Sequence, residues 1–365
     1  MTKQIKAVLI GDAMIRGSEF KLAAEKYLGD FIADAKVGDW EEDWGKLQER
    51  RLKVEKEGPE IEVVDPLIKE HGSTAELLAG LFVPISSKVF AAMPKLRIAG
   101  VSRAGLENVN VAEATKRGIV IFNVEGRNAE AVSDFAVGMM LCECRNMARA
   151  HFAIKNGQWR KTFSNSSWVP QLKDKNVGIV GFGYIGRLVA QKLSGFKAKC
   201  LVYDPFVAAD EVRRLGCTPV DKDTLFAESD FVTIHARMSE ATKNMVGEQE
   251  LRRMKPTAYL VNTARAGLLD QSALIAALQE KRIAGAGLDV FQDEPLKPDS
   301  PFLSLDNVTL TTHIAGTTKE ALSSSPELLM EDIKKLLSAQ QPRFVVNKEV
   351  LDRPDFKAWL KGVQQ

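Results

Sequence analysis

Three residues with acid–base or anion-binding side chains each follow a run of residues typical of a buried β-strand. They are Arg265 after Ala258–Asn262, Glu294 after Ala286–Val290, and His313 after Val308–Thr311. In a sheet of parallel strands the carboxyl ends of the strands finish at one edge, which is also where ligands bind. We therefore expect these three side chains to meet, although they lie far apart in the chain.

The chemistry available to this trio is proton transfer beside a bound carboxylate. Histidine titrates near neutral pH and can donate or accept a proton, and an adjacent carboxylate stabilises its imidazolium form. The planar guanidinium of arginine binds a carboxylate at two points. We interpret His313 as the acid/base, Glu294 as its partner and Arg265 as the carboxylate binder. A lone residue of any of these three types is more often structural or a surface charge, but the three together on successive strand ends favour a catalytic site.

Two series of strand-like runs alternate with helical patterns, which is typical of βαβ units around parallel sheets. The first series is Lys6–Ile10, Ile61–Val64, Gly80–Val83, Arg97–Val101 and Val120–Asn123. The second series is Val177–Gly181, Lys199–Tyr203, Phe231–Ile234, Ala258–Asn262, Ala286–Val290 and Val308–Thr311. The spacing predicts two α/β domains.

Apolar residues at helical spacing predict one long helix over Asn128–Arg149, between the two series. A polar loop over Lys155–Pro170 leads into the second series. Helical spacing returns over Thr318–Ala339, followed by a short strand at Phe344–Val346 and a small helix. The second domain, residues 128–318, is therefore expected to be inserted into the first, residues 1–127 plus 319–365.

A glycine-rich turn follows the first strand of the second series. Its sequence Gly181-Phe182-Gly183-Tyr184-Ile185-Gly186 is GxGxxG, with a strand before it and a helix after it. The three glycines permit the tight turn, the close approach of a pyrophosphate and the packing of helix on strand. The free N–H groups of the helix then face the phosphates. This context predicts a Rossmann dinucleotide-binding domain.

The choice between NAD and NADP depends on the end of the next strand. Asp204 ends that strand, and a carboxylate there accepts hydrogen bonds from both ribose hydroxyls and repels a 2′-phosphate. NAD is therefore favoured over NADP, although Arg237 could tolerate a phosphate. With a nicotinamide to supply a hydride, the trio would interconvert a 2-oxo acid and a 2-hydroxy acid. His235, which ends another strand, is expected near the cofactor or in a structural role.

Composition excludes other classes of partner. Among 365 residues the net charge is +2, which favours neither nucleic acid nor an anionic membrane. No apolar run is long enough to span a membrane, and the first residues suggest a strand, not a signal peptide. The four cysteines lack metal-binding spacing. We expect a cytoplasmic protein with reduced thiols, no metal, and a small-molecule substrate.

The chain resembles the D-isomer-specific 2-hydroxyacid dehydrogenases. The matching segments are NVEGRNAEAVSDFAVGMML (123–141), GIVGFGYIG (178–186), VNTARAGLLD (261–270), AGLDVFQDEP (286–295) and THIAGTT (312–318). The likeness is good over roughly 75–340 and loose over the first 70 residues. It implies an NAD-binding Rossmann lobe inserted into a flavodoxin-like substrate lobe, with substrate in the cleft between them. It also implies a homodimer centred on the inserted lobe.

The resemblance also assigns roles to individual residues. It implies the same roles for His313, Glu294 and Arg265 as the chemistry does. The substrate-binding residues that it implies are Arg103, Ala104, Gly105 and Asn108. The cofactor-binding residues are Gly181, Gly183, Tyr184, Ile185, Gly186, Asp204, His235, Ala236, Thr242, Thr263 and Asp289.

The identity of the substrate stays open at this point. Arg160 and Lys161 lie in the polar loop, and Arg103 and Arg127 are expected near the substrate. These cations favour a polar or phosphorylated sugar acid over a plain aliphatic 2-oxo acid. The alternative function is a non-enzymatic NAD-sensing protein built on the same scaffold.

Overall fold

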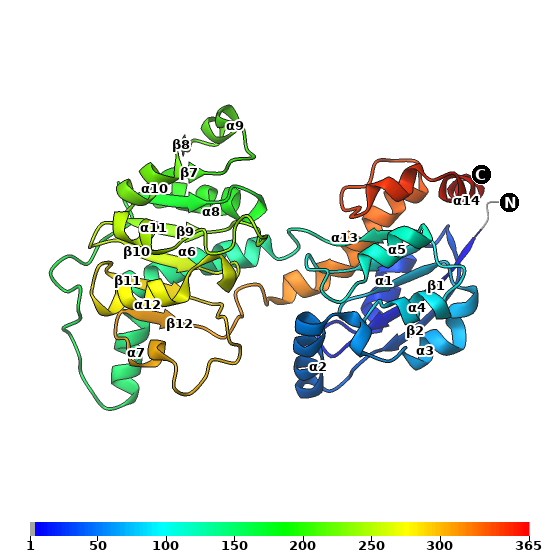
Figure 1. Cartoon of the computed structure of the whole chain (residues 1–365), viewed down its shortest axis with the longest axis horizontal. Coiled ribbons are helices and arrows are strands. Elements are labelled where there is room, and N and C mark those ends of the chain that lie inside the picture. The colour runs from blue at the N-terminus through cyan, green and yellow to red at the C-terminus, as the bar shows by residue number, and fades with distance from the viewer. Residues whose placement is uncertain (1–3, 365) are drawn as a thin grey trace. The chain divides into compact units, whose positions relative to one another are not determined.

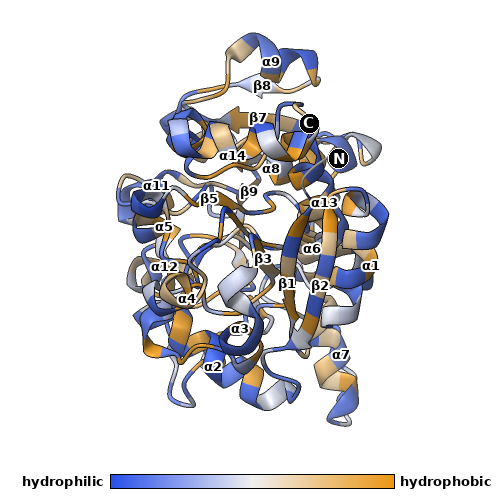
Figure 2. Ribbon diagram, turned by 90° about the vertical axis from the view of Figure 1, so that its right-hand side faces the viewer, coloured by the Kyte–Doolittle hydropathy of each residue, from blue (hydrophilic) through white to orange (hydrophobic). Residues whose placement is uncertain are grey.

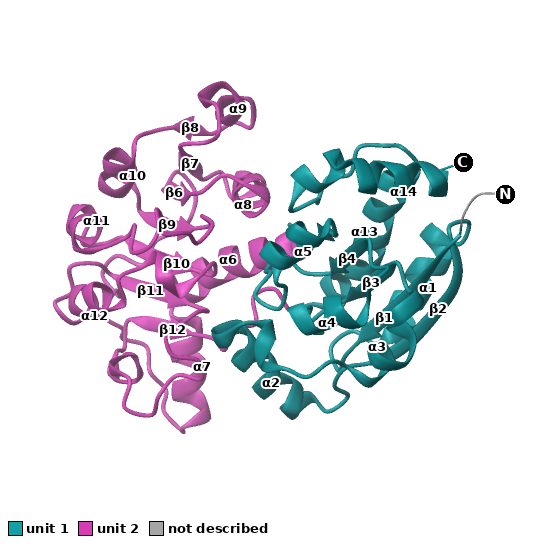
Figure 3. Cartoon of the chain, turned by 45° about the vertical axis from the view of Figure 1, so that its right-hand side comes forward, with its two compact units in different colours: residues 1–127, 318–365 teal, residues 128–317 magenta. Residues whose placement is uncertain are grey.

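The chain divides into two compact units (Figure 3). Unit 1 comprises Met1–Arg127 and Thr318–Gln365, and unit 2 comprises Asn128–Thr317. The computed structural model describes residues 4–364, so the outermost residues of the predicted first domain lie outside it. The expected boundary after residue 318 is one residue late. Thr318 belongs with unit 1 because its side chain accepts a hydrogen bond from Ala321 N and caps the helix that follows.

Unit 1 is a five-stranded parallel sheet with the strand order β2-β1-β3-β4-β5. This order is that of the flavodoxin-like doubly wound fold. Its elements, of which Figure 1 labels the α-helices and the first two strands, are β1 (Ile5–Gly11), α1 (Gly17–Leu28), β2 (Ile32–Asp39), α2 (Trp44–Glu57), η1 (Pro59–Ile61), α3 (Pro66–His71), η2 (Gly72–Thr74), β3 (Leu77–Gly80), α4 (Ser87–Ala92), β4 (Ile98–Val101), α5 (Val111–Arg117), β5 (Val120–Phe122), α13 (Lys319–Leu337), η5 (Lys348–Asp352) and α14 (Pro354–Gln364).

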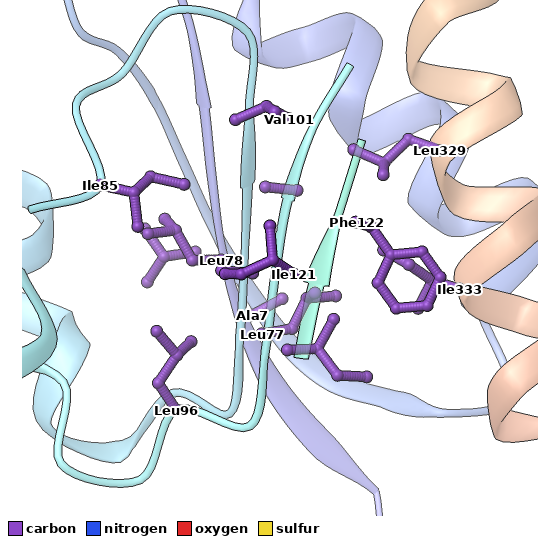
Figure 4. Close-up of a cluster of buried hydrophobic side chains, with 14 of the residues drawn as sticks. Ala7, Leu77, Leu78, Ile85, Leu96, Val101, Ile121, Phe122, Leu329 and Ile333 are labelled. Carbon is purple, nitrogen blue, oxygen red and sulfur yellow. The ribbon is translucent and has the colours of Figure 1, made fainter. Parts of the chain in front are cut away.

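The core of unit 1 lies on both faces of this sheet (Figure 4). Ile85 and Leu96 pack on one face, and Leu329 and Ile333 of α13 pack on the other beside Phe122. Because both faces are covered, the strands β3, β4 and β5 are apolar and buried throughout, as in other parallel sheets. The covering helices are amphipathic, and many carry both hydrophilic and hydrophobic residues along their length (Figure 2).

Unit 2 is a seven-stranded parallel sheet with the strand order β12-β11-β10-β9-β6-β7-β8. The order reverses beside β6, as in a Rossmann fold. Its elements are α6 (Ala129–Cys144), α7 (Met147–Lys155), β6 (Asn176–Val180), α8 (Tyr184–Gly195), β7 (Lys199–Tyr203), α9 (Ala209–Arg214), β8 (Thr218–Pro219), α10 (Lys222–Glu228), β9 (Phe231–Ile234), α11 (Glu248–Arg253), β10 (Tyr259–Asn262), η3 (Ala266–Leu268), α12 (Gln271–Gln279), β11 (Gly285–Leu288), η4 (Pro301–Ser304) and β12 (Val308–Leu310). None of the helices described is long and apolar enough to cross a membrane.

Several sequence predictions about elements are wrong. The predicted strand Gly80–Val83 is displaced, since β3 covers Leu77–Gly80. Residues 61–64 do not form a strand, and Ile61 and Val63 are exposed. The strand missed in that region is β2, an edge strand whose polar, partly exposed residues gave no strand pattern. The single helix predicted over Asn128–Arg149 is two helices, α6 and α7. Asn146 interrupts it with a left-handed backbone (φ 59°).

The chain end returns to the edge of the unit 1 sheet. The predicted strand at Phe344–Val346 is reduced to one antiparallel bridge between Phe122 and Val345. Buried Asn347 secures this return: its Oδ1 accepts from Ile121 N (2.8 Å) and its Nδ2 donates to Ile119 O (2.9 Å). This one side chain therefore satisfies two backbone groups, one just before β5 and one within it.

We expect Asn347→Ala to lower the free energy of unfolding by roughly 2–3 kcal/mol, because buried backbone groups of β5 lose their partners. Urea denaturation followed by circular dichroism measures this change. Gln341→Ala, at an exposed amide of the same segment, is the control and should change stability by less than about 0.5 kcal/mol. Equal effects of the two substitutions would contradict this role of Asn347.

Candidate active site

The three strands that precede the predicted trio are neighbours in unit 2. β10 pairs with β11, and β11 pairs with β12, all in parallel. Arg265, Glu294 and His313 therefore follow the carboxyl ends of three adjacent strands at one edge of the sheet. Of these residues the structure brings His313 and Glu294 into direct contact.

His313 and Glu294 form a hydrogen-bonded pair. Nδ1 of His313 lies 2.8 Å from Oε2 of Glu294, and Oε1 of Glu294 accepts from Phe291 N (2.9 Å). An ionised carboxylate can only accept, so Nδ1 carries a hydrogen and Nε2 is the nitrogen left for other chemistry. The His313 side chain is 41% exposed, so this nitrogen belongs to an accessible ring.

The backbone of His313 is in the left-handed region, with φ 57°. Such a conformation is uncommon for a residue with a side chain, and it clusters at functional sites. Buried Asp289 supports the turn, since its oxygens accept from Ile314 N (3.0 Å), Ala315 N (2.9 Å) and the Thr311 hydroxyl (2.6 Å). Asp289 therefore shapes the loop that presents His313, and its predicted contact with nicotinamide stays a prediction.

Arg265 lies at the end of β10, on an exposed turn. Asn262 shapes this turn: its Oδ1 accepts from Ala264 N (3.0 Å) and its Nδ2 donates to Arg265 O (3.0 Å). The guanidinium of Arg265 donates to Ala264 O (2.8 Å). No hydrogen bond joins Arg265 to His313 or Glu294 in the part of the chain that the structure describes, and carboxylate binding by Arg265 stays a prediction.

The glycine-rich turn has the geometry that a dinucleotide requires. Gly181 has φ 91°, and a Cβ there would lie 2.6 Å from Ala236 N. A Cβ at Gly186 would lie 2.2 Å from Gly181 O, so a side chain there would push α8 off the strand. A Cβ at Gly183, in contrast, would meet nothing within 4 Å. Gly183 directly precedes Tyr184 and Ile185 at the start of α8, so the helix end is open to a phosphate.

Other predicted cofactor residues surround the same sheet edge. Asp204 follows β7, and its oxygens accept from Phe182 N (2.7 Å) and Phe206 N (2.8 Å). The carboxylate thus fixes the glycine-rich turn. Its predicted hydrogen bonds to the ribose hydroxyls stay a prediction. Thr242 closes its own loop by donating to Arg237 O (2.7 Å).

Two buried polar atoms at this edge have no partner within residues 4–364: Thr263 Oγ1 after β10 and His235 Nδ1 after β9. Burial lowers the pKa of His235 to about 3, so this ring is neutral near pH 7 and is no candidate for the acid/base. Unpaired buried polar atoms are costly, and they fit a site completed by a polar ligand. Together with the open start of α8, they fit a bound dinucleotide.

The predicted substrate loop lies in unit 1, after β4. Asn108 is buried, and its Nδ2 donates to Val83 O (3.0 Å), which holds the loop in place. The loop's other end is fixed by Asn123, which donates to Ala104 O (2.9 Å). Gly105 has no side chain to obstruct Glu107, whose Oε2 lies 3.2 Å from Arg103 Nη2.

The side chain of Arg103 is already occupied by protein carboxylates. Besides Glu107, its Nη2 contacts Glu55 Oε1 at 2.9 Å, and its guanidinium lies 4.7 Å from the centre of the Phe82 ring. Glu55 belongs to α2, 48 residues earlier in the chain. No motif in the sequence identified this partner, so sequence analysis missed it.

Arg160, one of the two cations of the polar loop, is paired with a carboxylate within unit 2. Its guanidinium makes a two-point ion pair with Asp306, with Nη1 2.9 Å from Oδ1. Asp306 precedes β12, whereas His313 follows it, so the two lie at opposite ends of this strand. Over the described residues, no group of three or more His, Cys, Asp or Glu side chains is arranged to hold a metal ion.

Comparison with known proteins agrees with this geometry. Residues 137–315 match the model of the D-isomer specific 2-hydroxyacid dehydrogenase NAD-binding domain. A glyoxylate reductase of Korarchaeum cryptofilum is 39% identical over 299 residues, 80% of this chain and 88% of that protein. A D-3-phosphoglycerate dehydrogenase of Archaeoglobus fulgidus is 33% identical over 310 residues, 83% of this chain but 58% of that longer protein.

Solved structures share the fold. A glyoxylate reductase from Paecilomyes thermophila matches with a TM-score of 0.73 at 24% identity, over 96% of this chain and all of that one. An NAD-complexed D-isomer specific 2-hydroxyacid dehydrogenase from Lactobacillus delbrueckii matches with a TM-score of 0.72 at 22% identity, over 93% of this chain and all of that one.

A Rossmann unit whose sheet edge carries a histidine–carboxylate pair beside a dinucleotide turn defines a nicotinamide-dependent dehydrogenase. This chain belongs to the D-isomer-specific 2-hydroxyacid dehydrogenase family. It is an oxidoreductase that uses NAD and acts on 2-hydroxy or 2-oxo acids. The alternative of a non-enzymatic NAD sensor is not favoured, since the relatives named above are reductases and dehydrogenases.

We expect Gly183→Ala to weaken NADH binding about tenfold or more while leaving the fold intact. The new methyl group meets no protein atom, but it occupies the space through which the pyrophosphate approaches the backbone. Quenching of protein fluorescence by NADH measures the dissociation constant. Gly195→Ala, at the other end of α8 and equally free of contacts, is the control and should bind like the wild type. Unchanged affinity in Gly183→Ala would contradict this use of the turn.

Proposed function

We propose that the protein reduces a small, polar 2-oxo acid to the D-2-hydroxy acid, and catalyses the reverse reaction, with His313 as acid/base. The observation that carries this proposal is the 2.8 Å hydrogen bond between His313 and the oriented carboxylate of Glu294. It fixes the ring so that Nε2 is the atom available to a substrate oxygen.

In the proposed reaction, bound NADH supplies the hydride that reaches C2 of the substrate. Arg265 binds the C1 carboxylate and so orients the adjacent carbonyl. His313 donates the proton from Nε2 to the carbonyl oxygen, and Glu294 stabilises the imidazolium form of the ring before this transfer. In the oxidative direction the same nitrogen accepts the hydroxyl proton.

The substrate loop of unit 1 is proposed to bind through backbone N–H groups of Arg103, Ala104 and Gly105. This assignment is supported by the ion pairs of Arg103 Nη2 with Glu55 and Glu107, which compensate the charge of this side chain, so the guanidinium is not reserved for the substrate carboxylate. Relatives of this chain are named for glyoxylate and for D-3-phosphoglycerate, so we propose a substrate from this range of short, polar acids.

We also propose a homodimer that forms through α7. The helix has a single buried residue, Ala153, while Phe152 is 70% exposed and Ile154 is 55% exposed. Exposed Leu303 joins Phe152 around a surface hollow of about 430 Å³. An exposed apolar patch of this kind is typical of an interface with a second copy.

We propose a cytoplasmic location on the basis of the four unpaired cysteine thiols.

We expect His313→Ala to lower kcat by a factor of 100 to 10,000, the range typical of general acid–base catalysis, while NADH binding stays unchanged. The assay follows NADH absorbance with glyoxylate, hydroxypyruvate, pyruvate and phosphohydroxypyruvate. His71→Ala, at a histidine in unit 1, is the matched control and should retain full activity. Full turnover by His313→Ala, or no turnover of any 2-oxo acid by the wild type, would exclude the proposed mechanism.

We expect Phe152→Asp to convert the dimer to a monomer, because a charge would be buried at the centre of the apolar contact. Analytical ultracentrifugation measures the mass in solution. Leu215→Asp places the same charge at an exposed apolar residue outside α7 and should leave the dimer intact. A wild-type protein that sediments as a monomer would refute the proposed interface.

A further inference from the structure

One cation at the edge of the unit 1 sheet lacks a compensating carboxylate. Arg127 ends the segment that follows β5, and Val124 of that segment donates to Arg103 O (2.9 Å), so the segment runs beside the substrate loop. Throughout residues 4–364, no carboxylate oxygen lies within 4.0 Å of the Arg127 guanidinium. Its neighbour Arg103, in contrast, has both Glu55 and Glu107.

The contacts that Arg127 does make are with neutral oxygens. Its Nη1 lies 3.2 Å from the Ser325 hydroxyl and 3.5 Å from Ala321 O, both on α13. These are long for hydrogen bonds from a guanidinium, and they bring no opposite charge. Burial and, to a smaller degree, the charge of Arg103 lower the pKa of Arg127 to about 10, so the side chain stays positively charged at neutral pH.

The charge of Asp12 acts on Arg127 and raises its pKa to a smaller degree than burial lowers it, but no ion pair joins the two side chains in the described part of the chain. Asp12 follows β1, and its oxygens accept from Met14 N (2.8 Å), Ile15 N (3.2 Å) and Phe82 N (3.3 Å). Burial raises the pKa of Asp12 to about 6, which shows how poorly this surrounding solvates its charge. Arg127 thus remains a partly buried cation for which an anion would be a favourable neighbour.

The substrate loop after β4 contains unsatisfied polar atoms, most of them hydrogen-bond donors. Arg103 Nη1 and the Ser102 hydroxyl are buried without a partner within the described chain, as is the acceptor Asn108 Oδ1. The edge of the unit 1 sheet therefore combines a positive charge that has no ion-pair partner among the described residues with spare donors. This is the electrostatic character of a region that attracts an anion.

We propose that Arg127 binds a second anionic group of the substrate, and so selects 2-oxo acids that carry a terminal phosphate or carboxylate. The inference rests on the proposed function, because it assigns a specificity residue to the same reaction.

The test compares matched substrates in wild type, Arg127→Gln and Arg127→Lys. One pair is phosphohydroxypyruvate and hydroxypyruvate, and the other is 2-oxoglutarate and 2-oxopentanoate. We expect the wild type to prefer the more highly charged member of at least one pair, and the pair that shows it identifies phosphate or carboxylate. Arg127→Gln should reduce that preference tenfold or more, through KM and not kcat, and Arg127→Lys should restore part of it.

A structural role for Arg127 predicts a different result. If Arg127 served only to hold α13, Arg127→Gln would lower the rates of both members of a pair equally, and the inference would be wrong. Arg117→Gln, which removes a surface arginine paired with Glu113, is the control and should leave the preference unchanged. A wild type with no preference for the charged members would also overturn the inference while leaving the proposed function intact.

A binding measurement keeps the test independent of turnover. Inorganic phosphate should raise the unfolding temperature of the wild type and of Arg117→Gln, but not of Arg127→Gln. Glutarate serves as the dicarboxylate probe in the same measurement. If neither phosphate nor glutarate raises the unfolding temperature in a way that depends on Arg127, the anion site is refuted, even if no 2-oxo acid is turned over. Binding without turnover would instead count against the proposed function alone.

Discussion

Every pair of strands in both sheets is parallel, and this single constraint decides where the chemistry of the molecule can lie. Parallel strands need a crossover after each strand, so all strands of a sheet end at the same edge and deliver their following loops to one place. In unit 2 this brings the dinucleotide turn after β6, Asp204 after β7 and His313 after β12 to one edge. In unit 1 it does the same for Asp12 after β1 and the substrate loop after β4.

The loops at these edges are held by carboxylates that directly follow strands. Asp12 follows β1, Asp204 follows β7 and Asp289 follows β11, and each uses both oxygens to accept backbone N–H groups. A carboxylate is well suited to this task, because it offers several acceptor sites and makes stronger hydrogen bonds than a neutral group. Residues predicted to bind substrate or cofactor therefore also hold the loops in place. A substitution at any of them would change both the loop conformation and ligand binding.

The sequence was informative wherever short-range pattern decides the structure. β7 and β9 have the predicted bounds because β9 is buried throughout and β7 is buried over its three central residues. The ends of the predicted strands then located His313, Glu294 and Arg265. The edge strand β2 was not predicted because its residues are partly exposed and include Asp34 and Asp39. Its composition therefore lacks the apolar pattern that identifies a buried strand.

Contacts between distant side chains could not be foreseen. Nothing in the sequence around Arg103 indicates that Glu55 of α2 neutralises it, and nothing around Arg160 indicates Asp306. Spacing and motifs report which residues share an element or an edge. They do not show which charged side chains form ion pairs between different elements. The presence or absence of such an ion pair is what distinguishes Arg103 from Arg127.

The break between α6 and α7 shows the same limit, and it explains the exposed apolar helix. Arg149 folds back so that Nη2 lies 2.9 Å from Oε1 of Glu143, a fully buried carboxylate that also accepts from Thr309 of β12. Removing either partner would leave the other charge buried alone, so the pair strongly favours one direction for the chain after Asn146. Periodicity favoured a continuous helix because both halves are helical. The buried pair instead turns α7 away from the core, and its apolar residues remain at the surface, which is the patch that we propose as the contact with a second copy.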